Sequence, residues 1–322
     1  MIKILQDVSL KNFSNYKIGG NASYFFEAKT RDEIIEAIQQ WNIISKDFQE
    51  ELKKVFVLGA GTNILFSDQG FDGLVIKNSI LGIEKNNNNV LVKAGESMSG
   101  LLNFCIENSL SGLEWAGGLP GSVGGAVRGN AGSFGGETKD NLLEVESLNL
   151  KTLQTVKRNN KDCLLSYRNS IFKQNAKDEV IISISFKLDL GVKEDIEKKT
   201  NEKVEYRKNK HPLEYPNIGS IFKNVPVENI PDKFKKELSQ YIKDDPFPVI
   251  PSAKLIFLAG LNGKRVGNVM VSEKHTNFIV NLGNGKASEV SELIKLIKQK
   301  IHESFGILLE EEIMYVGGDL NG

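Results

Sequence analysis

Cysteine is scarce in this chain, and neither sign of charge is in excess. The two cysteines, Cys105 and Cys163, lie far apart and outside any CxxC spacing, which excludes a disulfide-rich scaffold and a cysteine-based metal site. Both are predicted to be buried core thiols in a reducing compartment. The 41 basic residues match the 41 acidic ones, so no net field draws the protein to nucleic acid or to an anionic membrane.

Long hydrophobic runs are also missing. No stretch approaches the roughly eighteen apolar residues of a membrane helix, and the first residues, MIKILQDVSLKN, lack the apolar core of a signal peptide. We therefore expect a cytoplasmic protein with no membrane partner and no metal site. The 322 residues, 40% of them hydrophobic, are enough for two or three compact units with buried cores.

Glycine, by contrast, is concentrated in one segment. Residues 112–137 hold ten glycines in twenty-six positions, a density at which we expect a loop and no helix. Glycine lets backbone N–H groups approach a ligand closely, so the segment predicts a loop that wraps a large anionic cofactor. A flexible linker is the alternative, but apolar residues at packing intervals argue against it, namely Leu119, Pro120, Val123, Val127 and Phe134.

Periodicity along the chain predicts a mixture of helices and strands. Thr30 and Glu33 form a capping box, which places a helix start near Arg31. Alternation from Val180 to Leu188 predicts a half-exposed strand. Further strands are expected at 55–58, 74–76, 90–92 and 307–316, and further helices around 101–106, at 192–210 as a solvated connector, and at 289–305 with an apolar stripe.

A second glycine motif, LGAGTN at 58–63, follows a predicted strand, and its amides are suited to hold a phosphate. It is not a GxGxxG fingerprint, because Ile64 stands where the third glycine would be. GLNGKR at 260–265 has the wrong spacing for a P-loop, and Ser133 lacks the glycine pattern of a nucleophile elbow. The two phosphate-cradling stretches together favour a dinucleotide whose phosphates are held by backbone amides.

Several motifs occur in an order that resembles one enzyme family. They are NFSNYKIGGNA at 12–22, LGAGTNILFSD at 58–68, the glycine segment at 112–137, YRNSIFK at 167–173, PNIGSIFKN at 216–224, SEKHTNFIVN at 272–281 and FGILLEEEIMYVG at 305–317. On these motifs the chain resembles the UDP-N-acetylenolpyruvoylglucosamine reductases (MurB), flavoenzymes of peptidoglycan precursor synthesis, from Phe13 to Gly317. The short span from Arg168 to Ser220 is similar to the subgroup that lacks an extra tyrosine-bearing loop.

The resemblance implies an α+β fold. A two-part FAD-binding module of the vanillyl alcohol oxidase type would be followed by a C-terminal α+β substrate domain. The first part of the module would comprise residues 1–78, with the C-terminal strand 307–322 returning to it, and the second part residues 79–210. The substrate-binding domain would comprise residues 211–306.

The resemblance also implies the cofactors and partners. FAD would be bound and NADPH would be a co-substrate, with a UDP-sugar as the substrate of a monomeric enzyme. The residues expected around the FAD are Gly59, Ala60, Gly61, Thr62, Asn63, Ile64, Leu65, Gly118, Pro120, Gly121, Ser122, Gly124, Gly125, Ala126, Asn130 and Gly132. Arg128 and Gly129 depart from the family, which usually has bulkier apolar residues before Asn130.

The implied reaction reduces an enolpyruvyl ether to a lactyl ether. NADPH passes hydride to the flavin, and the reduced flavin delivers it to the terminal carbon of the enolpyruvyl group. Arg168 matches the family arginine that would stabilise the resulting enolate through its fork of donors. Ser220 matches the proton donor, and Glu312 matches the glutamate that assists it. Glu310 is the fallback for Glu312, because both would lie on one face of a strand.

Three further residues match positions that contact the diphosphate and nucleotide of the substrate, and they are Arg207, Lys210 and Asn224. His275 is expected to be structural. Two other functions stay open: an oxidase that uses the same FAD module with oxygen, and a nucleotide-binding protein without turnover. Arg168, Ser220 and the substrate-contact matches argue against the oxidase, and the retention of all three catalytic matches argues against the binding protein.

Overall fold

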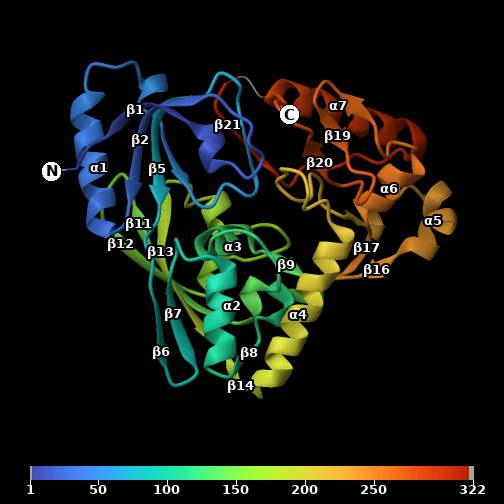
Figure 1. The fold of residues 1–322 in the computed structure, drawn as a ribbon, viewed down its shortest axis with the longest axis horizontal. Helices are drawn as coiled ribbons and strands as arrows, with labels where there is room; N and C mark the ends of the chain where they lie inside the picture. Colours follow the sequence, from blue (N-terminus) through green and yellow to red (C-terminus); the bar gives the residue numbers. More distant parts are fainter. Residues whose placement is uncertain (1, 319–322) are drawn as a thin grey trace. The chain divides into compact units, whose positions relative to one another are not determined.

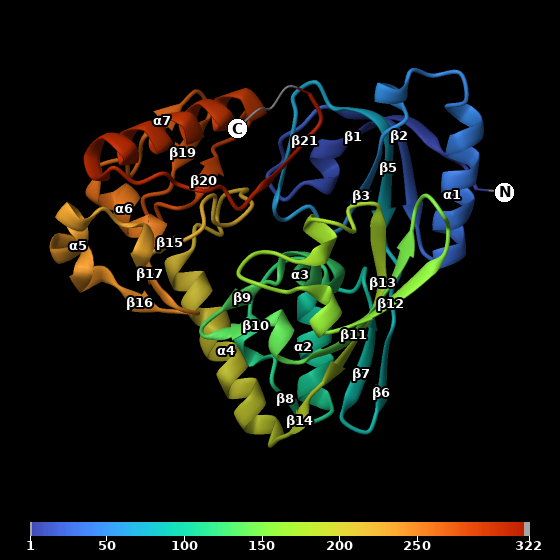
Figure 2. The same ribbon diagram turned by 180° about the vertical axis from the view of Figure 1, so that it is seen from behind.

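The chain passes repeatedly between two units, each built from separate stretches of sequence. The computed structural model describes residues 2–318, and Figures 1 and 2 show its ribbon from two sides. The first unit contains the residues up to Val8 together with Ala22–Ala60 and Asp72–Arg207. The second unit contains Ser9–Asn21, Gly61–Phe71 and the chain from Lys208 onward. The three-part division expected from the sequence stays a prediction.

Helices and strands are mixed throughout both units. The α-helices are α1 (Arg31–Ile44), α2 (Met98–Glu107), α3 (Val123–Gly129), α4 (Lys193–Lys210), α5 (Asp232–Leu238), α6 (Ser252–Leu258) and α7 (Ala287–Phe305). The strands are β1 (Leu5–Ser9), β2 (Asn21–Ala28), β3 (Val55–Leu58), β4 (Ile64–Phe66), β5 (Phe71–Asn78), β6 (Ile83–Asn86), β7 (Asn89–Lys93), β8 (Leu110–Ser111), β9 (Gly132–Ser133), β10 (Gly136–Glu137), β11 (Leu142–Asn149), β12 (Thr155–Asn159), β13 (Glu179–Lys187), β14 (Asp189–Leu190), β15 (Val225–Pro226), β16 (Lys243–Asp244), β17 (Pro248–Ile250), β18 (Arg265–Val266), β19 (Val269–Val271), β20 (Ile279–Asn281) and β21 (Met314–Val316). Within the part of the chain that the structure describes, no helix is both long enough and apolar enough to cross a membrane.

In the first unit, α1 packs on a sheet ordered β1-β2-β5-β3 (Figure 1). The helix begins where the sequence predicts, because the Thr30 hydroxyl accepts the Glu33 N–H at 3.1 Å. The Trp41 ring packs on the Tyr24 ring of β2, with the ring centroids 4.8 Å apart. The other buried residues of the helix are Ile34, Ala37 and Ile38. The apolar residues that recur at helical spacing in the sequence therefore form the face of α1 that packs on the sheet.

Strand β13 lies in the middle of a second sheet, ordered β12-β11-β13-β7-β6 (Figure 2). The sequence predicted a half-exposed strand here, and that prediction is wrong. Ile184 and Phe186 lie in a core formed with α2 and α3. The pairing of β13 with β11 shifts register at Ile182, and Val180 and Ile182 lie in the core of the first sheet, whereas Ile181 joins the other core. Because both faces are covered, even the intervening Ser183 is only 5% exposed.

The glycine segment is not a continuous loop, and the prediction that it holds no helix is wrong. It contains α3, which is capped by the Ser122 hydroxyl and ends at Asn130 in the left-handed conformation. Glycine costs a helix about 1 kcal/mol relative to alanine. Close packing offsets this cost, because a Cβ on Gly124 would lie 2.8 Å from the Cβ of Ala94, just after β7.

Both cysteines are buried and unbridged, as predicted. Burial raises the pKa of the Cys105 thiol to about 12 and that of the Cys163 thiol to about 11. Both thiols therefore stay protonated at neutral pH and are unreactive core groups.

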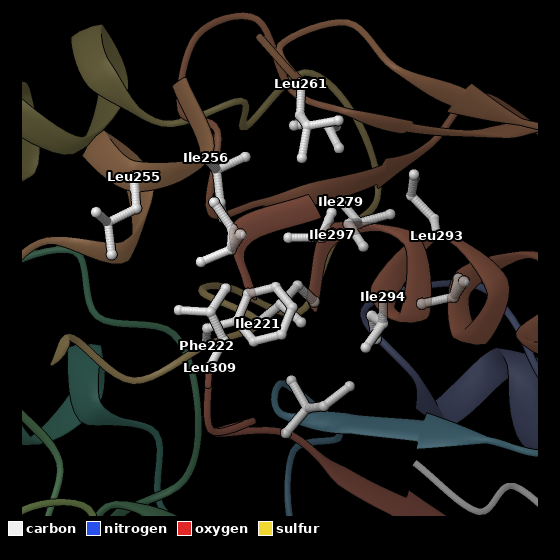
Figure 3. Packing of buried hydrophobic residues seen from close by; sticks show 14 of the residues in the cluster. Ile221, Phe222, Leu255, Ile256, Leu261, Ile279, Leu293, Ile294, Ile297 and Leu309 are labelled. Carbon is white, nitrogen blue, oxygen red and sulfur yellow. The ribbon is translucent and has the colours of Figure 1, made fainter. Parts of the chain in front are cut away.

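The second unit is organised around α7 and the sheet β18-β19-β20. The apolar stripe predicted for this helix is buried and consists of Val290, Leu293, Ile294, Ile297, Ile301 and Phe305. Figure 3 shows part of this core, to which Ile279 of β20 contributes. The core also takes in Tyr16, Ile18 and Leu65 from the two early stretches of the unit. The Asn281 amide donates to the Tyr16 carbonyl at 3.0 Å, which joins residues 265 positions apart.

The predicted final strand is shorter than expected. β21 spans only Met314–Val316 and pairs in parallel with β4. Residues 307–313 lie outside any regular strand, apart from one isolated bridge between Glu311 and Phe222. Residues 319–322, the end of the predicted strand, lie outside the described residues.

Candidate active site

The start of the first glycine motif lies against the glycine segment within the first unit. A Cβ on Gly59, at the end of β3, would come within 2.7 Å of the Ser122 hydroxyl oxygen. The Gly124 N–H donates to the Ala94 carbonyl at 2.9 Å, and the Gly125 N–H donates to the Ser122 hydroxyl at 3.3 Å. These amides are therefore used within the protein, and the glycines that carry them allow close packing.

A cavity of about 690 Å³ lies beside this contact, within the first unit. Its volume is in the range of small-molecule and cofactor sites. Four predicted cofactor residues line it, namely Gly59, Ser122, Gly124 and Gly125. Aromatic and basic side chains complete much of the wall, among them Trp41, Phe56, Phe172, Lys53, Lys54, Arg128, Lys151 and Lys177. Two acidic residues also line it, Asp178 and Glu179, and they form ion pairs with Lys151 and Arg158. A glycine wall with basic side chains fits an anionic cofactor that carries aromatic rings.

Arg128, in the last turn of α3, is a lining residue that the sequence did not assign to the cofactor. Burial lowers the pKa of its guanidinium, and no carboxylate of the described residues opposes that shift. Partial burial of a charge that no described carboxylate offsets is costly, and an anionic ligand would compensate it. The sequence did contain a signal for this role, because Arg128 stands where the family usually has a bulkier apolar residue before Asn130.

Arg168 lies in a tight turn of the first unit. The N–H groups of Ser166 and Asn169 each donate to the carbonyl of the other residue, at 3.1 and 3.0 Å. Arg168 between them has a φ of +55°, a strained conformation for a residue with a side chain and one that is common at functional sites. Its Nη2 donates to the Gly132 carbonyl at 2.8 Å, and its guanidinium lies 5.2 Å from the centroid of the Tyr167 ring.

Asn130, which was predicted to contact the cofactor, is fully buried and holds this turn. Its Nδ2 donates to the Ser166 carbonyl at 3.0 Å, and its Oδ1 accepts the Lys139 N–H at 3.1 Å. Asn130 therefore links the end of α3 to the turn that carries Arg168.

Arg207, in the last turn of α4, is only 8% exposed. Its Nε donates to the Gly117 carbonyl at 2.9 Å, and its Nη2 donates to the Ser133 hydroxyl at 2.8 Å. Two donors that were expected to reach a substrate diphosphate are thus used inside the first unit. Of the other predicted substrate contacts, Lys210 ends α4, and the Asn224 side-chain oxygen accepts the N–H of the first residue of α6 at 3.3 Å.

Ser220 is fixed by the core of the second unit. It follows Gly219, whose φ of +84° favours glycine, and it precedes Ile221 and Phe222, which are 0% and 1% exposed. Figure 3 shows both of these side chains in the core. The Ile221 N–H donates to the Asn277 carbonyl at 2.8 Å. The serine therefore lies on a turn whose next two residues are anchored.

Glu312 lies opposite this anchored segment. Its N–H donates to the Ile221 carbonyl at 2.8 Å, one residue after Ser220. Its own carbonyl accepts the Asn63 side-chain N–H at 3.1 Å, which joins residues 249 positions apart. Within the second unit the fold thus brings Glu312 beside the Ser220 segment and beside one residue of the first glycine motif.

The three consecutive glutamates have different surroundings. The Glu310 side chain is 72% exposed and forms an ion pair with Lys223. The Glu311 side chain is only 11% exposed and accepts from Lys298 Nζ at 2.8 Å and from the hydroxyl of the tyrosine in β21. Because Glu310 is at the surface and Glu311 is already occupied by a partly buried network, these surroundings favour Glu312 as the functional carboxylate.

Two family models match most of the chain. An FAD binding domain matches residues 22–152, and a C-terminal domain of UDP-N-acetylenolpyruvoylglucosamine reductase matches residues 211–316. The order of these matches confirms the predicted fold class, an FAD-binding module followed by a C-terminal α+β domain.

Individual proteins match over nearly the whole length. A UDP-N-acetylenolpyruvoylglucosamine reductase of Caldicellulosiruptor bescii is 37% identical over 319 residues, covering 98% of this chain and 91% of the relative. A UDP-N-acetylenolpyruvoylglucosamine reductase 2 of Bacillus cereus is 34% identical, covering 98% and 93%. The crystal structure of MurB from Thermus caldophilus superimposes with a TM-score of 0.74 at 28% identity and covers 98% of this chain and 99% of its own. The chain therefore belongs to the UDP-N-acetylenolpyruvoylglucosamine reductase family.

Proposed function

We propose that this chain is an NADPH-dependent flavoenzyme of peptidoglycan precursor synthesis. Its reaction is reduction of the enolpyruvyl ether of UDP-N-acetylglucosamine enolpyruvate to UDP-N-acetylmuramate. The family membership gives the reaction. The structural observation that carries the proposal is the hydrogen bond that holds Glu312 beside the segment of Ser220 in the second unit.

The cavity of the first unit fits FAD. Its glycine wall allows close approach, and its basic side chains suit a diphosphate. When bound, FAD supplies a two-electron carrier that accepts a hydride from NADPH and gives one to the terminal carbon of the enolpyruvyl group. We assign the four glycine-motif lining residues and Arg128 to this site, and the other predicted FAD contacts stay predictions.

We assign to three residues of the chain the stabilisation of the negative charge formed on the substrate and the delivery of a proton to it. After hydride addition, negative charge spreads from the carbon next to the carboxylate onto the carboxylate itself. Arg168 presents a planar fork of N–H donors that suits this carboxylate. Ser220 donates its hydroxyl proton to the charged carbon, because a carbanion-like centre is far more basic than water. We assign to Glu312 the support of this proton transfer.

The finer assignments follow from the same reaction. Lys210 and Asn224 are proposed to contact the UDP portion of the substrate, since a point charge and an amide suit a diphosphate and a nucleotide. A cytoplasmic location and a monomeric state fit a chain that acts on a nucleotide sugar. Both stay predictions.

Anaerobic flavin absorbance tests the proposed function. The purified protein with FAD is expected to be yellow, to bleach with NADPH, and to regain its colour when UDP-N-acetylglucosamine enolpyruvate is added. Mass spectrometry should find a product heavier than the substrate by two hydrogens. Reoxidation by oxygen but not by this substrate would indicate an oxidase, and a protein that cannot bind FAD would indicate a nucleotide-binding protein without turnover.

Replacing Arg128 with methionine is expected to weaken FAD binding by about ten- to a hundredfold, the loss typical of one hydrogen bond to a charged group. Titration of the apoprotein with FAD, followed by flavin fluorescence, measures this change. Thermal unfolding of the apoprotein should not show destabilisation, because the substitution removes a partly buried charge whose desolvation no carboxylate of residues 2–318 offsets. Arg31→Met, an exposed arginine of α1, is the control and should leave both quantities unchanged. Equal FAD affinity in Arg128→Met would contradict the assignment.

A further inference from the structure

Strand β9 is held on consecutive residues by two guanidinium groups, both in the first unit. Arg168 Nη2 donates to the carbonyl of Gly132 at 2.8 Å. Arg207 Nη2 donates to the hydroxyl of the next residue, Ser133, at 2.8 Å. The Nε of Arg207 donates in turn to the Gly117 carbonyl at 2.9 Å, fifteen positions before β9 in the same glycine segment. These bonds form a continuous connection from Gly117 through Arg207 and β9 to Arg168.

The position of Arg207 is fixed on its other sides too. Its guanidinium lies 5.3 Å from the centroid of the Phe134 ring, and Tyr206 packs edge-on against the same ring at 5.2 Å. A Cβ on Gly118 would lie 3.0 Å from the Arg207 Cδ, so the glycine permits the helix to come this close. A buried guanidinium with two directed bonds and a ring beneath it has little freedom to move.

The two guanidiniums are also close enough to influence each other. Burial, and after it the charge of Arg168, lowers the pKa of Arg207 to about 10. Arg207 therefore remains charged at neutral pH. Two like charges near each other are unfavourable, and the bonds to β9 help to hold them in place.

We propose that Arg207 is a positioning residue, which sets the place of Arg168 through β9. This inference rests on the proposed function, because Arg168 is there the group that meets the substrate carboxylate. It differs from the sequence-based prediction that Arg207 contacts the substrate diphosphate. Direct contact would make Arg207 a determinant of substrate affinity, whereas positioning makes it a determinant of the rate at saturating substrate.

A double-mutant cycle with Arg207→Lys and Arg168→Lys tests the inference. Lysine keeps the charge but cannot make the two directed bonds. Arg207→Lys alone is expected to lower the rate of substrate-driven flavin reoxidation at saturating substrate by up to about a hundredfold, as for a misplaced catalytic group. In the Arg168→Lys background the same change should cost less than about threefold, since the group to be positioned is already altered. The KM for the substrate should change little in the single variant.

Two further variants separate positioning from general damage to the fold. Ser133→Ala removes the hydroxyl that accepts from Arg207 and donates to the Trp115 carbonyl at 3.1 Å, while both guanidiniums stay in place. It should reproduce part of the rate loss, so the inference can be tested even if Arg207→Lys folds poorly. Lys203→Met removes the other cation over the Phe134 ring, 5.3 Å from its centroid and one turn earlier in α4, and should change the rate less than about twofold. FAD affinity and thermal unfolding are measured for each variant as checks on folding.

The outcomes are distinguishable from failure of the proposed function. If the unmodified protein is not reoxidised by the enolpyruvyl substrate, the proposed function is wrong. If it is reoxidised, but the effects of Arg207→Lys and Arg168→Lys multiply independently, Arg207 does not act through Arg168. A raised KM with an unchanged rate at saturation would overturn the inference in favour of direct contact with the substrate.

Discussion

Replacing Ser220 with alanine is expected to slow oxidation of the reduced enzyme by the enolpyruvyl substrate by about 10²- to 10⁴-fold, the usual contribution of a positioned acid. Alanine has no proton to give, so the charged carbon would have to take one from water. Reduction by NADPH should keep its rate, because that half-reaction needs no proton from Ser220. Anaerobic stopped-flow absorbance of the flavin measures the two half-reactions separately.

Ser220→Cys is the matched variant for this experiment, since a thiol restores a transferable proton at the same position. It should recover part of the rate lost in Ser220→Ala. The neighbouring anchors Ile221 and Phe222 are unchanged in both variants, so thermal unfolding should remain close to that of the unmodified protein. Equal slowing of both half-reactions would show that the serine has another role.

Replacing Glu312 with glutamine is expected to slow the same half-reaction by about a hundredfold. The amide keeps the size of the side chain and removes its charge and its capacity to take a proton. The backbone bonds of Glu312 to Ile221 and Asn63 do not depend on the side chain, so the local geometry should persist. Stopped-flow measurement of flavin reoxidation again gives the rate.

The two neighbouring glutamates are built-in controls. Glu310→Gln removes only a surface ion pair with Lys223 and should leave the rate nearly unchanged. Glu311→Gln breaks a partly buried ion pair with Lys298, so we expect lower thermal stability and a smaller rate loss than for Glu312→Gln. A larger loss in Glu310→Gln than in Glu312→Gln would shift the functional carboxylate by two positions.

The sequence predicts best those elements whose signals are local. The capping pair Thr30 and Glu33 marks the start of α1, and the apolar stripe marks α7, because caps and helical periodicity act over a few residues. The chain order of the family motifs was a second strong signal. It named Ser220 and Glu312 before the fold showed that their segments are hydrogen-bonded in one unit.

The errors arose where distant packing decides the outcome. The seven-residue helix α3 is rich in glycine, and it is stable here because its small residues allow contact with Ala94. The alternation in β13 suggested one solvent-exposed face and one buried face. In the fold both faces are buried, because the apolar residues of the strand are divided between two cores. Neither partner can be identified from the segment itself.

The role of Arg207 shows the same limit at the site. Its acceptors, Gly117 and Ser133, lie 90 and 74 positions away in the sequence. From the local sequence, Arg207 is only an arginine at the end of a charged helix, and such a residue is usually expected to be solvent-exposed or to bind a ligand. Burial and directed bonds, which only the fold provides, turn it into a structural support for β9.

The second unit has a consequence for biogenesis. Its core includes Tyr16, Ile18 and Leu65, which are synthesised long before the other residues of this core, Ile218 to Ile313. During translation these side chains cannot be buried until the C-terminal part has been synthesised. Contacts between such distant residues slow folding, because the entropy of loop closure is lost before the stabilising contacts form. The segment 211–316 is therefore not a module that can be excised intact, because on its own it would leave part of this core open to water.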